Sequence, residues 1–138
     1  MSKPETTFTA AVHKHLPPGR EEPYWMKNNN VYTAGIWDVW YSGEAADLWV
    51  EYKFIVLPKR DSTPILAELS ELQLKWGRDR YAEGRNLAVI IGCKEGGVVL
   101  WDKDWELPMT AYDFKKQMMS RKELAEWIIR YTQKGLVS

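Results

Sequence analysis

The sequence contains a single cysteine, Cys93, so it can form neither a disulfide within the chain nor a cysteine-based zinc cluster. Cys93 ends an apolar run over residues 87–93, which indicates a buried free thiol of the kind that suits a reducing cytosol. The chain also lacks an apolar run long enough to cross a membrane or to act as a secretion signal. We therefore expect a soluble protein of the cytoplasm with no membrane association.

Neither sign of charge is in excess, because 19 Lys and Arg residues balance 19 Asp and Glu residues. A passive nucleic-acid-binding module usually carries a clear basic excess, so this balance counts against that class. It is compatible with an enzyme whose carboxylates bind a metal ion. The two histidines, His13 and His15, lie two positions apart in an expected helix and do not share a face, which argues against a two-histidine metal site.

Tryptophan, in contrast, is plentiful, with eight among 138 residues. The length fits one domain over residues 1–138, and most of the tryptophans are expected to fill its core. The alternative for some of them is stacking on nucleic-acid bases.

Hydrophobic periodicity and turn residues predict the order helix, three strands, helix, two strands, helices. Ser70 and Ser120 each begin a capping box, with Gln73 and Glu123 three residues later. The order predicts a mixed α/β domain, with a central sheet flanked by helices over about 6–101 and a C-terminal helical extension over 110–135. Helices are expected at 6–16 and 70–84, strands at 24–27, 35–41, 48–56, 87–92 and 98–101, turns at 28–30 and 96–97, loops at 42–47 and 57–64, and a helix end at Gly135.

The segment Glu51-Tyr52-Lys53 carries the charges that need explaining. Residues two apart in a strand point to the same face, so Glu51 and Lys53 lie side by side. Charged side chains in an aromatic-rich strand are costly unless they are paired or bind a metal ion. A solvated strand face is the alternative interpretation.

A second carboxylate comes from the strand across the hairpin. If Tyr41 pairs with Leu48, Asp38 faces Glu51, and opposed like charges destabilise a sheet. A divalent cation between them removes the repulsion, and Mg²⁺ is typically held by one or two carboxylates, waters and substrate phosphate. Such a cation activates water and polarises a phosphoryl oxygen, while Lys53 could orient the water or neutralise charge. The group therefore favours phosphodiester hydrolysis.

These residues and their spacing resemble the PD-(D/E)xK nuclease superfamily. The resemblance is to the VRR-NUC and Holliday-junction-resolvase group, especially its small phage-encoded members. It covers residues 6–101 and depends on Gly35-Ile36-Trp37-Asp38, Trp49-Val50-Glu51-Tyr52-Lys53, Leu72-Gln73 at a helix start, and Gly84 before the strand 87–91. The chain departs from the family pattern at Trp37, where the family has proline.

The resemblance implies a restriction-endonuclease-like fold and a DNA endonuclease that uses Mg²⁺ or Mn²⁺. The implied reaction is nicking of duplex DNA or cleavage of branched DNA such as a Holliday junction, in phage DNA processing within a host cytoplasm. In this family Asp38 and Glu51 would ligate the metal, Lys53 would be the catalytic lysine, and Gln73 would approach the site from its helix.

Many family members add a carboxylate from the first helix, and Glu5 is the candidate for this third metal ligand. Its alternative role is a favourable interaction with the helix dipole. Glu21 and Glu22 are weaker candidates. We also expect the two roles of Gln73 to compete, because a side chain that reaches back to Ser70 should not also point into the site.

Basic residues near the site are candidates for contacts with the DNA backbone. The alternative for each of them is a solvated position balanced by nearby acidic residues. The four candidates are Lys59, Arg60, Lys75 and Arg78.

Two rivals to an active nuclease are a catalytically inactive DNA-binding module of the same fold and a module that binds a host protein. The resemblance also predicts a homodimer, because resolvase-like members present two active sites. A C-terminal stripe offers one possible dimer surface, although it could equally pack on its own sheet. It consists of Leu124, Trp127, Ile128 and Tyr131.

Overall fold

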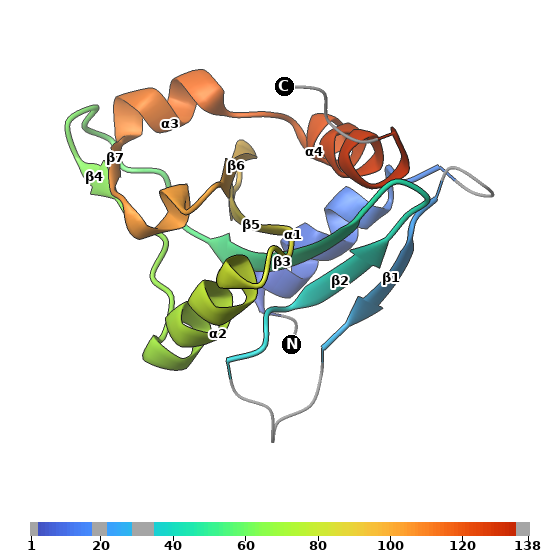
Figure 1. The fold of residues 1–138 in the computed structure, drawn as a ribbon. Coiled ribbons are helices and arrows are strands. Elements are labelled where there is room, and N and C mark those ends of the chain that lie inside the picture. The colour runs from blue at the N-terminus through green and yellow to red at the C-terminus, as the bar shows by residue number, and fades with distance from the viewer. Residues whose placement is uncertain (1–2, 18–21, 29–34, 135–138) are drawn as a thin grey trace.

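The structure, a computed structural model, describes residues 3–17, 22–28 and 35–134. These residues form a mixed five-stranded sheet with helices on both faces, which confirms the predicted α/β architecture (Figure 1). The strand order is β1 (Tyr24–Lys27), β2 (Val39–Ser42), β3 (Asp47–Phe54), β5 (Leu87–Cys93) and β6 (Gly96–Trp101). The β3–β5 pair is parallel and the other three pairs are antiparallel.

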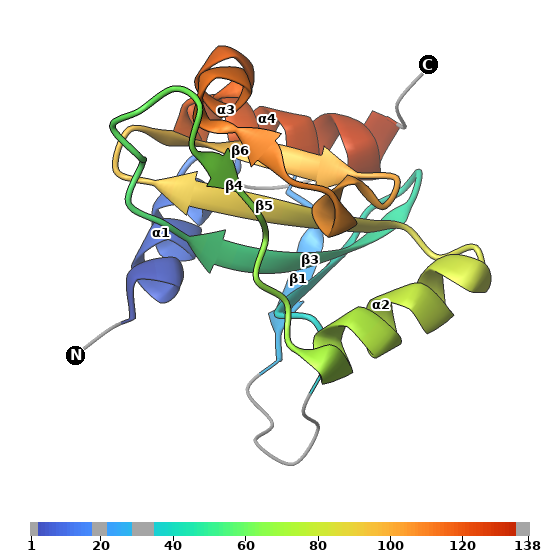
Figure 2. The ribbon, with the colours of Figure 1, turned by 90° about the vertical axis from the view of Figure 1, so that its left-hand side faces the viewer.

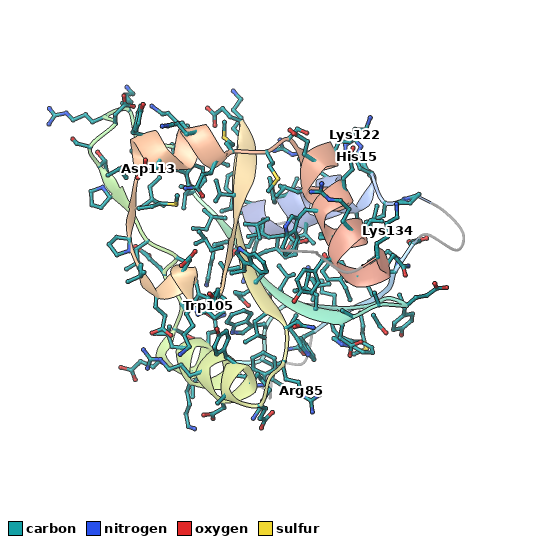
Figure 3. The ribbon with its side chains drawn as sticks, turned by 45° about the horizontal axis from the view of Figure 1, so that its top comes forward. His15, Arg85, Trp105, Asp113, Lys122 and Lys134 are labelled. Atoms are coloured by element: carbon teal, nitrogen blue, oxygen red, sulfur yellow. The ribbon has the colours of Figure 1, made fainter. Side chains whose placement is uncertain are left out.

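Each face of the sheet packs against helices through its own hydrophobic core. Helices α1 (Pro4–His13) and α4 (Arg121–Ile129) pack on one face, and α4 continues into the π-helical segment η3 (Arg130–Lys134). The other face carries α2 (Glu71–Ala82), α3 (Ala111–Gln117), the 3₁₀ helix η2 (Asp104–Glu106) and a small sheet of β4 (Pro64–Ile65) and β7 (Met109–Thr110). On this face Trp105 points into the interior beside α2 (Figure 3), where its ring contacts Trp37 and Tyr81.

The β2–β3 hairpin has the register that its loop predicts. Tyr41 pairs with Leu48 and Val39 with Val50. The predicted strand 35–41 is wrong at its start, because β2 begins at Val39. Gly35 has φ +95° and packs so closely on Leu72 that a Cβ atom would lie 2.8 Å from the Leu72 carbonyl oxygen. The chain therefore bends around the start of α2 before it enters the sheet.

Other element boundaries differ from the prediction for local reasons. Helix α1 begins at Pro4, where a proline suits the first turn, and ends at His13 rather than residue 16. The expected turn 96–97 lies inside β6, where Gly96 allows the Met119 backbone to approach and Gly97 forms a β-bridge to Met119. The expected loop 57–64 ends in the short strand β4. The expected turn 28–30 lies partly, and the helix end at Gly135 wholly, outside the described residues.

The C-terminal stripe packs within its own chain. Leu124, Ile128 and Trp127 are buried in the core under α1 and α4. Of the two interpretations of this stripe, a dimer surface and packing on the chain's own sheet, the structure shows the second. Across the described residues, no helix combines the length and the apolar character that crossing a membrane requires.

Candidate active site

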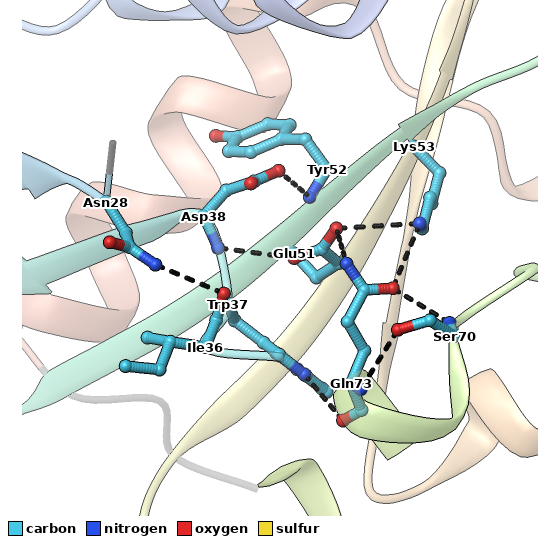
Figure 4. Close-up of polar contacts among 9 residues, drawn as sticks. All are labelled: Asn28, Ile36, Trp37, Asp38, Glu51, Tyr52, Lys53, Ser70 and Gln73. Atoms are coloured by element: carbon cyan, nitrogen blue, oxygen red, sulfur yellow. Dashed lines mark hydrogen bonds and ion pairs between the residues drawn. The ribbon is translucent and has the colours of Figure 1, made fainter. Parts of the chain in front are cut away.

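A pocket of about 240 Å³ brings together most of the predicted site residues. It lies where α1, the end of β1, the β2–β3 hairpin and the start of α2 meet. Its lining includes Asp38, Glu51, Lys53 and Gln73, which come from three separate segments of the chain (Figure 4).

Asp38 and Glu51 are held against each other by reciprocal bonds from the backbone. The Asp38 backbone N–H donates to Glu51 Oε1 at 3.2 Å, and the Tyr52 backbone N–H donates to Asp38 Oδ2 at 3.3 Å. Asp38 immediately precedes β2, so the hairpin register places these carboxylates next to each other as predicted. Glu51 is almost completely enclosed, with 3% of its surface exposed.

This crowding destabilises the ionised form of both carboxylates. Burial and the neighbouring Asp38 charge raise the pKa of Glu51 to about 8, although Lys53 acts in the opposite direction. Burial also raises the pKa of Asp38, against the Tyr52 backbone bond and the charges of Lys53 and Lys27. The metal-free site therefore favours a bound proton or another source of positive charge.

Lys53 and Gln73 connect the strand carboxylates to helix α2. Gln73 Nε2 donates to Glu51 Oε2 at 2.9 Å, and Lys53 Nζ donates to Gln73 Oε1 at 3.2 Å. The Lys53 ammonium also lies 3.6 Å from Glu51 Oε2. The triangle of Glu51, Lys53 and Gln73 therefore fixes the direction of the lysine side chain.

The predicted competition between the two roles of Gln73 is wrong. Its Oε1 accepts from the Ser70 backbone N–H at 2.9 Å and from Lys53, while its Nε2 faces Glu51. The capping box is completed by the Gln73 backbone N–H, which donates to Ser70 Oγ. An amide side chain has an acceptor and a donor at one end, so one rotamer serves the helix start and the site together.

The Gln73→Ala variant should lose both stability and activity. It removes the cap acceptor and the donor to Glu51, so we expect a loss of about 1–2 kcal/mol in the free energy of unfolding together with slower DNA cleavage. Ser70→Ala is the matched control, because it removes only the reciprocal cap bond and should cost about 1 kcal/mol while cleavage is kept. Denaturant unfolding and cleavage rates measure the two effects, and equal cleavage by both variants would contradict a site role for Gln73.

Two lysines of the pocket were missed by sequence reasoning. Lys27 and Lys3 line the pocket, and Lys27 Nζ donates to Thr6 Oγ1 at 3.4 Å. Lys27 reaches the site because β1 pairs with β2 so that Lys27 faces Val39, the residue after Asp38. The strand 24–27 was predicted, and an antiparallel pairing with the next strand would have located Lys27.

Of the carboxylates predicted as further metal ligands, Glu5 lines this pocket and Glu22 does not. Glu5 lines it and its charge acts on Asp38, but among the described residues no three Asp, Glu, His or Cys side chains form a group able to hold a metal ion. Glu5 also lies in the first turn of α1, so both of its interpretations stay open. Glu22 is exposed and does not line the pocket, and Glu21 lies outside the described residues.

The four residues predicted to bind DNA do not line the pocket. Lys75 pairs with Asp79 at 2.9 Å along α2, and Arg78 pairs with Glu106 at 2.6 Å. Lys59 and Arg60 are exposed in the segment after β3. A role in DNA binding stays a prediction for all four.

His13 belongs to a hydrogen-bond chain that leads from its partly buried ring to two buried tyrosines. Its Nε2 lies 2.7 Å from Tyr41 Oη, which lies 2.6 Å from Tyr52 Oη. Burial and the nearby Lys27 charge lower the pKa of His13 to about 4, so the ring is neutral near pH 7.

The donor set of the pocket fits a hard divalent cation. Two adjacent carboxylates supply oxygen ligands, and Mg²⁺ usually completes its shell with waters and substrate rather than with a full protein cage. Burial raises the pKa of both Glu51 and Asp38, and a bound cation would favour their ionised forms. Asp38 and Glu51 are therefore the residues that would hold the ion.

Glu51 should make the stability of the metal-free protein depend on pH. Its ordinary pKa of 4.5 rises to about 8 in the folded state, so its contribution to stability is present below pH 4.5 and is lost as the pH rises toward 8. The difference in melting temperature, Glu51→Gln minus parent, should therefore increase between pH 5 and pH 8 in EDTA. The lowered pKa of His13 acts in the opposite direction, but both proteins contain it and the subtraction removes it. A difference that stays constant would contradict the raised pKa.

Comparisons with known proteins identify the fold. No protein-family model matches the chain, and no curated protein matches its sequence. The structure is similar to that of Hjc, a Holliday junction resolvase from the archaeal hyperthermophile Archaeoglobus fulgidus, with a TM-score of 0.52 and 11% sequence identity over 88% of this chain and 99% of that chain. This likeness confirms the predicted fold, a mixed central sheet flanked by helices. Membership of the VRR-NUC group and a phage origin stay predictions.

Proposed function

We propose that this protein is an endonuclease that uses Mg²⁺ or Mn²⁺ to hydrolyse phosphodiester bonds in DNA, with branched DNA as its preferred substrate. The observation that carries the proposal is the convergence of Asp38, Glu51, Lys53 and Gln73 in one pocket. The likeness to a Holliday junction resolvase supports the choice of substrate. We further propose that it acts in phage DNA processing in the cytoplasm of a host cell.

Each side chain of the pocket has a defined part in the proposed reaction. A divalent cation held by Asp38 and Glu51 would polarise a phosphoryl oxygen and lower the pKa of bound water. Lys53, directed by Gln73, would orient the attacking water or neutralise charge that develops on the phosphate. Lys27 and Lys3 lie on the same pocket and would offset the charge of the DNA backbone.

A cleavage assay with four DNA forms tests the proposal. Supercoiled, linear, single-stranded and four-way-junction DNA are each incubated with the protein in Mg²⁺, in Mn²⁺ and in EDTA. We expect cleavage in either metal, fastest on the junction, and none in EDTA. Binding of DNA without cleavage of any form would replace the proposal with an inactive DNA-binding module.

Paired cuts at a junction require two active sites, and we propose a two-fold homodimer as their source. We expect a dimer by light scattering at micromolar concentration and two symmetric nicks per junction on a cleavage gel. The stripe on α4 and η3 does not provide the interface, because Leu124 and Ile128 are fully buried in the chain's own core. A strict monomer that only nicks plasmid DNA would exclude the resolvase form and leave a nicking endonuclease.

A further inference from the structure

Lys53 lines a second cavity, of about 260 Å³, beside the candidate active site. The floor of this cavity comes from neighbouring parts of the sheet. Lys53 of β3 pairs with Ile91 of β5, and Ile55, which follows β3, extends the apolar surface. Because Lys53 also lines the pocket with Asp38 and Glu51, the two cavities adjoin at this lysine. We name the second one the Lys53–Glu68 cavity.

The wall of the Lys53–Glu68 cavity is the segment between β4 and α2, which crosses the sheet in Figure 2. Burial alternates along this extended segment: Ile65 and Ala67 are buried, whereas Leu66 and Glu68 are exposed. Leu66 keeps 47% of its surface exposed, which is a large fraction for a leucine that lines a cavity. Because side chains alternate along an extended segment, those of Leu66 and Glu68 point to the same side of it.

The chemistry of this lining selects the kind of group that fits. Leu66, Ile55 and Ile91 provide an apolar surface, and Glu68 is an acceptor with a negative charge. The Lys53 ammonium is directed toward Gln73 and Glu51, so a phosphate is unsuited to the cavity. A flat ring with a hydrogen-bond donor on its edge is suited to it. A carboxylate accepts from the exocyclic amino group of cytosine, adenine or guanine, whereas thymine has no such group and presents its O4 acceptor.

The cavity lies next to Lys53, and in the proposed reaction Lys53 acts at the scissile phosphate. A base that enters the cavity would belong to a nucleotide flanking the phosphate on which Lys53 acts. A stacked and paired base cannot make this approach, because it must first leave the duplex.

We propose that the Lys53–Glu68 cavity holds an unpaired base with an exocyclic amino group, from a nucleotide next to the scissile phosphate. The inference deepens the proposed function and rests on it. It makes the enzyme selective for DNA with an unpaired, amino-bearing base at the cut site, such as a bulge or a branch point.

Matched duplexes and matched variants test this selectivity. Cleavage in Mg²⁺ is compared for a fully paired duplex and for the same duplex with one unpaired cytosine or one unpaired thymine. Leu66→Arg blocks the cavity, and Leu107→Arg is its control, because Leu107 is exposed and outside the cavity. Glu68→Gln removes the charge and offers a donor to thymine, and Glu126→Gln on α4 is its control.

The parent should cleave the cytosine-bulged duplex at least about fivefold faster than the other two. Leu66→Arg should abolish this preference and Glu68→Gln should reduce the difference between cytosine and thymine, while both controls keep the parent pattern. Equal rates on all three duplexes, or a preference that Leu66→Arg leaves unchanged, would overturn the inference.

A binding experiment in EDTA separates this inference from the nuclease proposal. The unpaired base is replaced by 2-aminopurine, whose emission rises when it leaves the base stack. The parent and Leu107→Arg should raise the emission, and Leu66→Arg should not. If the parent cleaves no DNA, the nuclease proposal fails, and the emission still decides the cavity: a rise that Leu66→Arg removes supports it, and no rise overturns it.

Discussion

Cleavage by the Glu51→Gln and Asp38→Asn variants should fall by on the order of 100-fold or more relative to the parent. Each substitution keeps the size of the side chain and removes one of the two adjacent negative charges that would hold a divalent cation. Lys53→Ala should reduce cleavage strongly as well, because it removes the ammonium directed by Gln73. Initial rates on junction DNA at pH 8 in Mg²⁺ measure these losses, with Glu126→Gln as the control.

Melting temperatures separate a lost site from a lost fold. Asp38 and Glu51 repel each other and burial raises both pKa values, so neither variant should melt below the parent in EDTA at pH 8. Added Mg²⁺ should raise the melting temperature of the parent and leave both variants unchanged, because a ligand stabilises only the protein that binds it. Variants that melt clearly lower without metal would show that the carboxylates serve the structure instead.

Removal of divalent cations should abolish cleavage completely, and Mg²⁺ or Mn²⁺ should restore it. A proton and a cation compete for Glu51, whose pKa is about 8 in the metal-free site. Higher Mg²⁺ concentrations should therefore move the pH of half-maximal cleavage to lower values, because the cation displaces the proton. Initial rates between pH 5.5 and pH 9 at several Mg²⁺ concentrations measure this shift.

Two results would contradict this mechanism. Full cleavage by well-purified protein in EDTA would exclude a role for the cation. A pH profile that stays in place as Mg²⁺ increases would show that Glu51 does not bind it. The Glu51→Gln variant serves as the background measurement in both experiments, since any cleavage it retains comes from another source.

The parts of the site that are local in sequence were predictable. The short loop between β2 and β3 determines which residues face each other, so the pairing of Tyr41 with Leu48 and the neighbouring positions of Asp38 and Glu51 followed from it. The two capping boxes located the starts of α2 and α4, because the bonds that make a cap join residues three apart.

The parts that depend on contacts between distant segments were not predictable. Lys3 enters the pocket only through the packing of α1, which no periodicity encodes, and Lys27 enters it only once the predicted strand 24–27 is paired with the next strand. The early start predicted for β2 failed because the chain packs Gly35 on Leu72 of another element. The double role of Gln73 also needed the distance between α2 and β3, which is a property of the folded chain.

The contact of Trp37 with α2 has a consequence for how this protein can evolve. The Trp37 indole N–H donates to the Gln73 backbone oxygen at 3.0 Å, and a Cβ atom at Gly77 would lie 2.6 Å from the same ring. Trp37 immediately precedes Asp38, so this contact sets the spacing between a carboxylate on the sheet and an amide on the helix. Positions 37 and 77 should therefore covary among homologues: a side chain larger than glycine at 77 should occur together with one smaller than tryptophan at 37.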